Sequence, residues 1–104
     1  MQNTTNNQET SYMMLLNIKV PQAEHARIQA KLSEISSGTS KAIYFDKHGG
    51  AFLFKTTLKA QQIYDRLIGT LLNDDRYIIV ELGTDWTTFG HEDAAGWLRK
   101  YLNS

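Results

Sequence analysis

The chain has 104 residues, of which 41% are hydrophobic and 21% charged, and this balance predicts one globular domain that buries about 60–65% of the unfolded chain's surface. Basic and acidic residues cancel to a formal net charge of +0, which argues against a protein whose surface is dedicated to binding nucleic acid. The absence of cysteine excludes disulfides and cysteine-ligated zinc. No apolar run reaches the ~20 residues that span a bilayer, so we expect a cytoplasmic protein without a membrane partner.

The N-terminal stretch MQNTTNNQET is polar and low in complexity. It predicts a flexible tail over residues 1–10, followed by a single domain over residues 11–104. The domain opens with a predicted strand, Ser11–Val20, whose alternate positions form two apolar rows. A strand of this kind is typical of the middle of a sheet that is covered on both faces. Pro21 ends the strand.

A helix and a β-hairpin follow the first strand. The helix ends before Gly38, and its buried stripe consists of Ile28, Leu32 and Ile35. Two short β-rich runs, Lys41–Phe45 and Ala51–Lys55, then flank a turn over residues 46–50. We expect the paired glycines of this turn to supply the positive φ values of a hairpin loop.

The second half of the chain predicts a helix, a strand and a last helix. The first of these helices opens near Thr57, and its stripe consists of Ala60, Ile63, Leu67 and Leu71. The run Arg76–Leu82 predicts a strand that is apolar on both faces apart from Glu81. Glu92 and Asp93 suit the first turn of the last helix. That helix has an apolar stripe of Ala94, Trp97, Leu98, Tyr101 and Leu102.

The element order predicts the fold class. A βαββαβ order with a further helix indicates an α+β protein, namely a ferredoxin-like antiparallel sheet with an extra C-terminal helix. Its first two helices share one sheet face, so the opposite face needs the last helix, a second subunit or both to cover it. The last strand lies at a sheet edge that neither proline nor glycine protects. We therefore expect a homodimer, with Tyr77, Ile79 and Glu81 at its sheet edge.

The polar residues do not form a recognised catalytic or metal-binding motif. His91 and Asp93 are two positions apart, so they do not share a helix face as the ligands of an HExxH motif do. His48 at the hairpin tip is a candidate for contact with phosphate or for acid–base chemistry, although a glycine turn holds geometry poorly. We expect no cofactor and no metal ion. Trp86 and Phe89 pin a loop over the sheet or, in the alternative, stack on bases.

A family resemblance covers mainly the second half of the chain. The stretches FKT at Phe54–Thr56, IYDRL at Ile63–Leu67 and DDRYIIVELGTDWTTFG at 74–90 resemble small ferredoxin-fold proteins related to the CRISPR adaptation subunit and the virulence-associated protein D family. This resemblance implies a compact homodimer whose sheets meet through strand edges. Its members bind nucleic acid, cleave RNA or DNA with magnesium, or serve as non-catalytic scaffolds.

One departure from the family concerns catalysis. The nucleolytic relatives have an aspartate at the end of the first strand, whereas this chain has LLNIKV, with Asn17 and Lys19. Asparagine offers magnesium an oxygen without a charge, and the lysine repels the ion. We therefore expect a non-catalytic homodimeric binding or scaffold protein, nucleic-acid-associated and of mobile-element or defence origin. Its candidate contacts with nucleic acid or another partner are Lys41, Lys47, His48, Lys55 and Arg76.

Two alternatives to this hypothesis stay open. One is a magnesium-dependent endonuclease of the same fold that uses Asn17, Asp46 or Asp85. The other is a regulatory module that binds a protein partner, or a small ligand on the sheet face between subunits.

Overall fold

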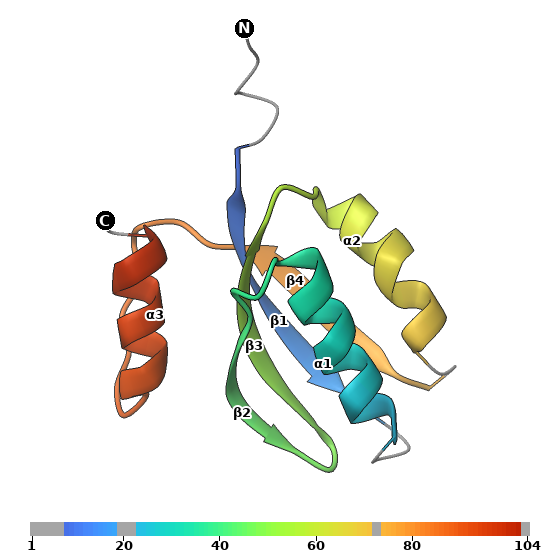
Figure 1. Ribbon diagram of the computed structural model, residues 1–104. Helices are drawn as coiled ribbons and strands as arrows, with labels where there is room; N and C mark the ends of the chain where they lie inside the picture. The colour runs from blue at the N-terminus through green and yellow to red at the C-terminus, as the bar shows by residue number, and fades with distance from the viewer. Residues whose placement is uncertain (1–7, 19–22, 72–73, 103–104) are drawn as a thin grey trace, which may run out of the picture.

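The computed structural model describes residues 8–18, 23–71 and 74–102. Its elements in chain order are β1 (Thr10–Asn17), α1 (Ala23–Ile35), β2 (Lys41–Asp46), β3 (Gly49–Thr56), α2 (Ala60–Leu67), the short 3-10 helix η2 (Ile68–Thr70), β4 (Arg76–Glu81) and α3 (Glu92–Leu102). The strands form one antiparallel sheet in the order β2-β3-β1-β4 (Figure 1). The predicted α+β class and the edge position of the last strand are confirmed. Val20, Pro21 and residues 1–7 of the predicted tail lie outside the described residues.

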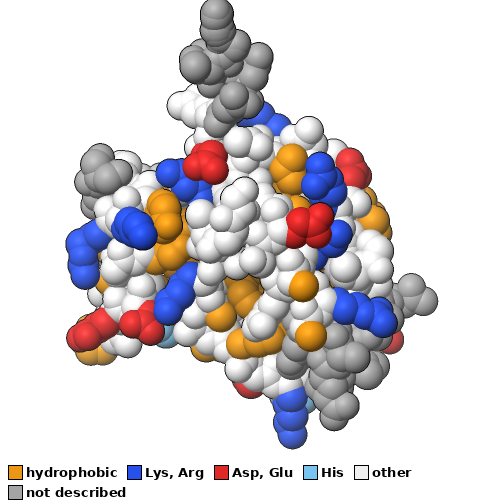
Figure 2. Space-filling view, in the orientation of Figure 1, with side chains coloured by type: hydrophobic (Ala, Val, Ile, Leu, Met, Phe, Trp, Pro, Cys, Tyr) orange, Lys and Arg blue, Asp and Glu red, His pale blue; other side chains and the backbone are white. Residues whose placement is uncertain are grey.

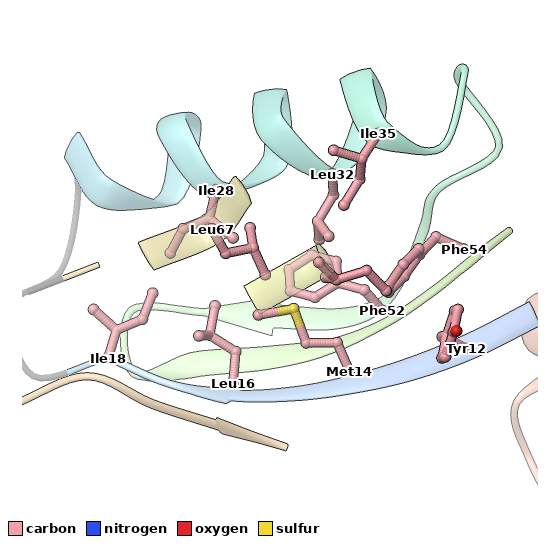
Figure 3. Close-up of a cluster of buried hydrophobic side chains, with 11 residues drawn as sticks. Tyr12, Met14, Leu16, Ile18, Ile28, Leu32, Ile35, Phe52, Phe54 and Leu67 are labelled. Atoms are coloured by element: carbon pink, nitrogen blue, oxygen red, sulfur yellow. The ribbon is translucent and has the colours of Figure 1, made fainter. Parts of the chain in front are cut away.

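Helices α1 and α2 cover one side of the sheet, which we call the first face (Figure 1). Figure 3 shows Met14 and Leu16 of β1 directed toward the helix side chains. The buried stripe of α1 matches the predicted one. In α2, Ile63 and Leu67 are buried as predicted, but Ala60 is exposed and Leu71 lies beyond the helix and is half-buried. The buried members of this core are Tyr12, Met14, Leu16, Ile18, Ile28, Leu32, Ile35, Phe52, Phe54, Ile63 and Leu67.

The hairpin glycines have a different role from the predicted one. The turn consists of residues 47–48, and both glycines belong to β3. Of the two, only Gly49 has a positive φ, of +132°. A β-carbon on Gly49 would collide with the carbonyl oxygen of Leu16, and one on Gly50 would collide with that of Tyr44. The glycines therefore allow the backbones of β1, β2 and β3 to approach each other closely.

The second helix begins later than predicted, at Ala60 instead of near Thr57. Its N-terminus is capped by Gln62, because the Lys59 backbone N–H donates to the Gln62 side-chain oxygen at 2.7 Å. At the end of β3, the Thr56 hydroxyl donates to the Ile35 carbonyl at 2.6 Å. This segment thus connects β3 to the end of α1 before α2 starts.

Helix α3 lies against the opposite side of the sheet, the second face, as predicted for the last helix (Figure 1). Trp97 is its anchor, because the indole Nε1 donates to the Thr39 carbonyl at 2.8 Å and the ring lies 4.7 Å from that of Tyr101. Glu92 and Asp93 occupy the first turn, as expected. The buried members of this second cluster are Leu53, Ala94, Trp97 and Leu98.

An irregularity in β2 adds aromatic surface to the second face. Ala42 pairs with Phe52 and Tyr44 pairs with Ala51, so Ile43 is an extra residue in β2. Ile43 packs against the second-face cluster, and Tyr44 lines the same side of the sheet. Without the extra residue, strict alternation would direct one of these two side chains to the first face.

Candidate functional site

The outer edge of β4 has backbone groups without a neighbouring strand. The Leu82 N–H donates to the Ser11 carbonyl at 2.8 Å, so the backbone groups of even-numbered β4 residues point toward β1. Those of Tyr77, Ile79 and Glu81 consequently point away from the sheet. The three predicted edge residues therefore lie on an edge strand, and their backbone groups face away from the sheet.

Beside this edge, the second face has uncovered apolar side chains. Ile78 is 60% exposed and Val80 is 44% exposed. They pair across β1 with Leu15 and Met13 respectively, so all four side chains lie on the second face. Helix α3 packs mainly over β2 and β3 and leaves the β4 side of this face open.

A cavity of about 390 Å³ opens on the second face between the sheet, α3 and the loop that precedes α3. Leu15 and Tyr44 contribute to its sheet wall, and Trp86 and Phe89 contribute from the loop. Trp86 packs against the second-face cluster and holds the loop over the sheet, as predicted. Phe89 is 98% exposed, so it does not share that role.

The candidate contacts for nucleic acid divide between the two ends of the sheet. Lys47, His48 and Arg76 lie at the hairpin end and are exposed. Lys41 and Lys55 lie at the other end, about 15 Å away for a strand of this length. Each of these two lysines has a carboxylate neighbour, Asp93 at 3.6 Å and Glu9 at 3.8 Å. Figure 2 shows basic and acidic side chains interspersed over the visible side of the molecule.

The three candidate magnesium ligands are not brought together. Asn17 and Asp46 both pair with Gly49, on opposite sides of it, so their backbones lie about 10 Å apart. The Asp46 carboxylate accepts the His48 backbone N–H at 2.8 Å and thereby stabilises the turn. Asp85 follows the other end of β4. Within the described part of the chain, no group of three His, Cys, Asp or Glu side chains could hold a metal ion.

Two tyrosines on the first face have perturbed ionisation. Burial raises the pKa of Tyr12, and the nearby Glu81 carboxylate adds to the increase. The Tyr12 hydroxyl donates to the Leu58 carbonyl at 3.0 Å. Burial likewise raises the pKa of Tyr77, with smaller contributions from Tyr64 and Asp65. Burial is the largest cause of both shifts.

Sequence reasoning did not find the cavity. Its sheet wall depends on the extra residue in β2, which directs Tyr44 to the same side as Leu15. The sequence shows no signal for that irregularity. A usable signal did exist for Phe89, since an aromatic residue beside Gly90 in a polar loop is a sign of exposed apolar surface.

Comparison with known proteins adds no family assignment, since no protein-family model, curated protein or solved structure matches this chain. Among the helices in the described ranges, none is long and apolar enough to cross a membrane.

Proposed function

We propose that this chain is a non-catalytic binding or scaffold protein with a ferredoxin-like fold that works as a homodimer. The element order and the strand order β2-β3-β1-β4 support the ferredoxin-like assignment. The open edge of β4 is the main observation that supports a homodimer. It combines outward backbone groups at Tyr77, Ile79 and Glu81 with uncovered apolar side chains at Ile78 and Val80.

A second β4 strand fits this edge in one preferred antiparallel register. When Ile79 lies on the two-fold axis, every outward residue forms a hydrogen-bonded pair, which gives about six backbone hydrogen bonds. With Ile78 on the axis, the number falls to about four. The first register also places Ile78 of one copy opposite Val80 of the other, on the second face.

Charge is compatible with self-association in this register. Tyr77 of one copy lies opposite Glu81 of the other, so a phenol meets a carboxylate instead of a like charge. Arg76 lies opposite Leu82, away from its own symmetry mate. The formal net charge of +0 adds no long-range repulsion between two copies.

The register is tested by cross-linking, which is clean because the chain has no cysteine of its own. We expect a mixture of Ile78→Cys and Val80→Cys chains to form a disulfide, since directly opposed residues fall within the Cα separation of ~4.4–6.8 Å that a disulfide needs. Each variant alone should not cross-link, because its two sulfurs lie on a diagonal. Efficient cross-linking of Ile78→Cys alone would instead place Ile78 on the axis.

Dimerisation itself is measured by light scattering over a range of protein concentrations. We expect the mass of two chains at micromolar concentration. A mass of one chain throughout this range, together with no cross-link in the mixture, would refute the dimer.

A non-catalytic role is supported by the separation of Asn17, Asp46 and Asp85 over the sheet. We expect labelled RNA and DNA to remain intact with magnesium. Cleavage that is abolished by Asp46→Asn or Asp85→Asn would overturn the non-catalytic proposal and favour the endonuclease.

Contact with nucleic acid is a narrower proposal for the hairpin end. It is supported by the position of Lys47, His48 and Arg76 at the same end of the sheet, although β1 separates Arg76 on β4 from the two hairpin residues. Replacing Lys47 and Arg76 with Gln should abolish salt-dependent retardation of labelled RNA or DNA. Lys41→Gln is the matched control, because this lysine is at the other end and has Asp93 as a neighbour. Equal retardation by all of these variants would contradict a nucleic-acid site at the hairpin.

A further inference from the structure

We propose that the second-face cavity is a binding site for a small, uncharged aromatic molecule, held within a single copy of the chain. The proposed dimer uses Ile78 and Val80 at the β4 edge, and neither side chain lines the cavity. Three other exposed apolar residues on this face, Leu15, Tyr44 and Phe89, do line it. Leu82 lines the cavity and also lies in the proposed seam, but all of the lining residues belong to one chain, so the site goes beyond the dimer and does not require it.

The shape of the cavity favours a small molecule over a protein segment. Its volume of about 390 Å³ lies within the range of ~300–1,000 Å³ that is usual for sites of small ligands. The sheet forms one wall, with Leu15 and Leu53 among its residues. Ala94 and Leu98 of α3 form a second wall, and the loop with Trp86 forms a third. A recess bounded in this way contacts a compact ligand on three sides.

The chemistry of the walls determines the charge of the ligand. The described residues that line the cavity include no Asp, Glu, Lys or Arg. An ionised ligand would lose its hydration without gaining an opposite charge, which is costly. Water against the apolar sheet wall has few polar partners there, so an apolar ligand can displace it at little cost. An uncharged, largely apolar ligand therefore suits these walls.

The aromatic residues determine the shape of the ligand. Tyr44, Trp86 and Phe89 contribute rings from β2 and from the loop. Tyr44 is 55% exposed and Phe89 is 98% exposed, so both retain apolar area that a ligand could cover. Aromatic rings in offset or edge-to-face contact gain energy beyond the burial of area, which favours a planar aromatic partner.

The polar side chains at the site allow one hydrogen-bonding substituent on the ligand. Thr87, Thr88 and His91 are exposed and line the same cavity. Hydroxyl groups and an imidazole both donate and accept hydrogen bonds. A ligand with its ring system against Leu15 and Leu53 could therefore direct a hydroxyl, amide or ring nitrogen toward this side.

The test uses N-phenyl-1-naphthylamine, an uncharged aromatic probe whose fluorescence rises in apolar surroundings. Its matched counterpart is 8-anilinonaphthalene-1-sulfonate, which has the same ring systems and a negative charge. We expect saturable binding of the uncharged probe with one site per chain, and binding of the sulfonate at least about tenfold weaker because its charge is unpaired. Failure of the uncharged probe to bind, or equal affinity for the two probes, would overturn the proposal.

Two substitutions locate the binding site. Ala51→Leu adds volume to the sheet wall of the cavity, and we expect it to weaken probe binding at least about tenfold. The matched control is Ala42→Leu, on an exposed β2 residue of the opposite face, and it should leave probe affinity unchanged. Equal binding by Ala51→Leu and the wild type would place the probe elsewhere and refute the site.

Phe89→Ala provides a second test of the site in case Ala51→Leu does not fold. Because the Phe89 ring is 98% exposed, its removal should leave the thermal midpoint unchanged while it weakens probe binding about fivefold. Unchanged affinity in this variant would contradict the aromatic contact.

The ligand site and the dimer fail in distinguishable ways. Probe binding should persist in a chain that carries Ile78→Thr and is monomeric by light scattering. Loss of probe binding in that monomer would assign the cavity to the seam between copies and overturn a site within a single chain.

Discussion

Trp97 is the residue on which the docking of α3 depends most directly. It is 8% exposed, its indole donates a hydrogen bond to the Thr39 carbonyl at 2.8 Å, and its ring contacts that of Tyr101. Thr39 in turn connects to β3, because its hydroxyl accepts the Lys55 backbone N–H at 3.0 Å. Replacing Trp97 with Phe or Ala therefore separates the contribution of the hydrogen bond from that of the ring.

The expected losses of stability differ between the two variants. Trp97→Phe removes the hydrogen bond and retains a ring, so we expect a loss of about 1 kcal/mol, because the partly buried Thr39 carbonyl regains contact with water. Trp97→Ala also leaves a large void, and we expect about 3–5 kcal/mol. Natural domains are stable by about 5–15 kcal/mol, so the second variant removes a large share of the total.

Urea unfolding followed by far-ultraviolet circular dichroism measures these losses. Hydrogen exchange then shows where they act, and we expect the amides of α3 to exchange much faster in Trp97→Ala than those of β1, which pairs with a strand on each side. Tyr64→Ala is the matched control, because that ring is 43% exposed on α2 and its removal should cost less than ~1 kcal/mol. A loss below ~1 kcal/mol for Trp97→Ala, with unchanged exchange in α3, would refute the assignment of Trp97 as the anchor.

Three further predictions concern the hairpin, the tyrosines and the dimer seam. Gly49→Ala should destabilise the chain by at least about 2 kcal/mol in urea unfolding, because φ is +132° and a β-carbon would collide with Leu16. The raised pKa of Tyr12 and of Tyr77 means that the folded state retains phenolic protons that the unfolded state releases, so stability should fall as pH rises above the usual tyrosine value of 10.0. Phenolate absorbance measured in a pH titration should show that both rings ionise at a pH above 10.0. Ile78→Thr should weaken the dimer at least about tenfold in sedimentation, since pairing would cover a side chain that is 60% exposed in each copy.

Each of these predictions has its own control or contrary outcome. A Gly69→Ala chain, where a β-carbon meets no atom within 4 Å, should lose little stability, and equal losses at Gly49 and Gly69 would contradict the collision. Tyr12→Phe should flatten the alkaline loss of stability, so an unchanged pH profile would remove Tyr12 as a cause. Ile68→Thr changes a similarly exposed side chain away from β4, and equal weakening of the dimer by both variants would contradict a seam at β4.

The sequence predicted most of the elements because their buried faces follow simple periods. The stripes of α1 and α3 are local patterns, and the structure confirms both. The first-face row of β1 is buried as predicted, whereas Leu15 in its second-face row is 43% exposed. Capping was predicted less well, since Thr57 resembles an N-cap residue whereas Gln62 supplies the cap in the structure. Propensity alone does not decide between two polar residues five positions apart.

The candidate sites were predicted unequally. The edge residues of β4 followed from the order of elements, because the topology fixes which strand has one neighbour. The basic residues looked like one set in the sequence, but the antiparallel hairpin places Lys41 and Lys47 at opposite ends of β2. Proximity along the chain therefore did not show that these residues divide between the two ends of the sheet.

By itself, the sequence determined which faces are apolar, and hence that a sheet covered by two helices needs a further cover on its other side. This information is local, because side-chain alternation and helical period depend on a few neighbouring residues. The tertiary structure alone decided that α3 covers part of the second face, that the glycines permit close backbone approach, and that Tyr44 and Phe89 line one cavity. These features join residues far apart in the chain, so they depend on the register of strands and on packing between elements.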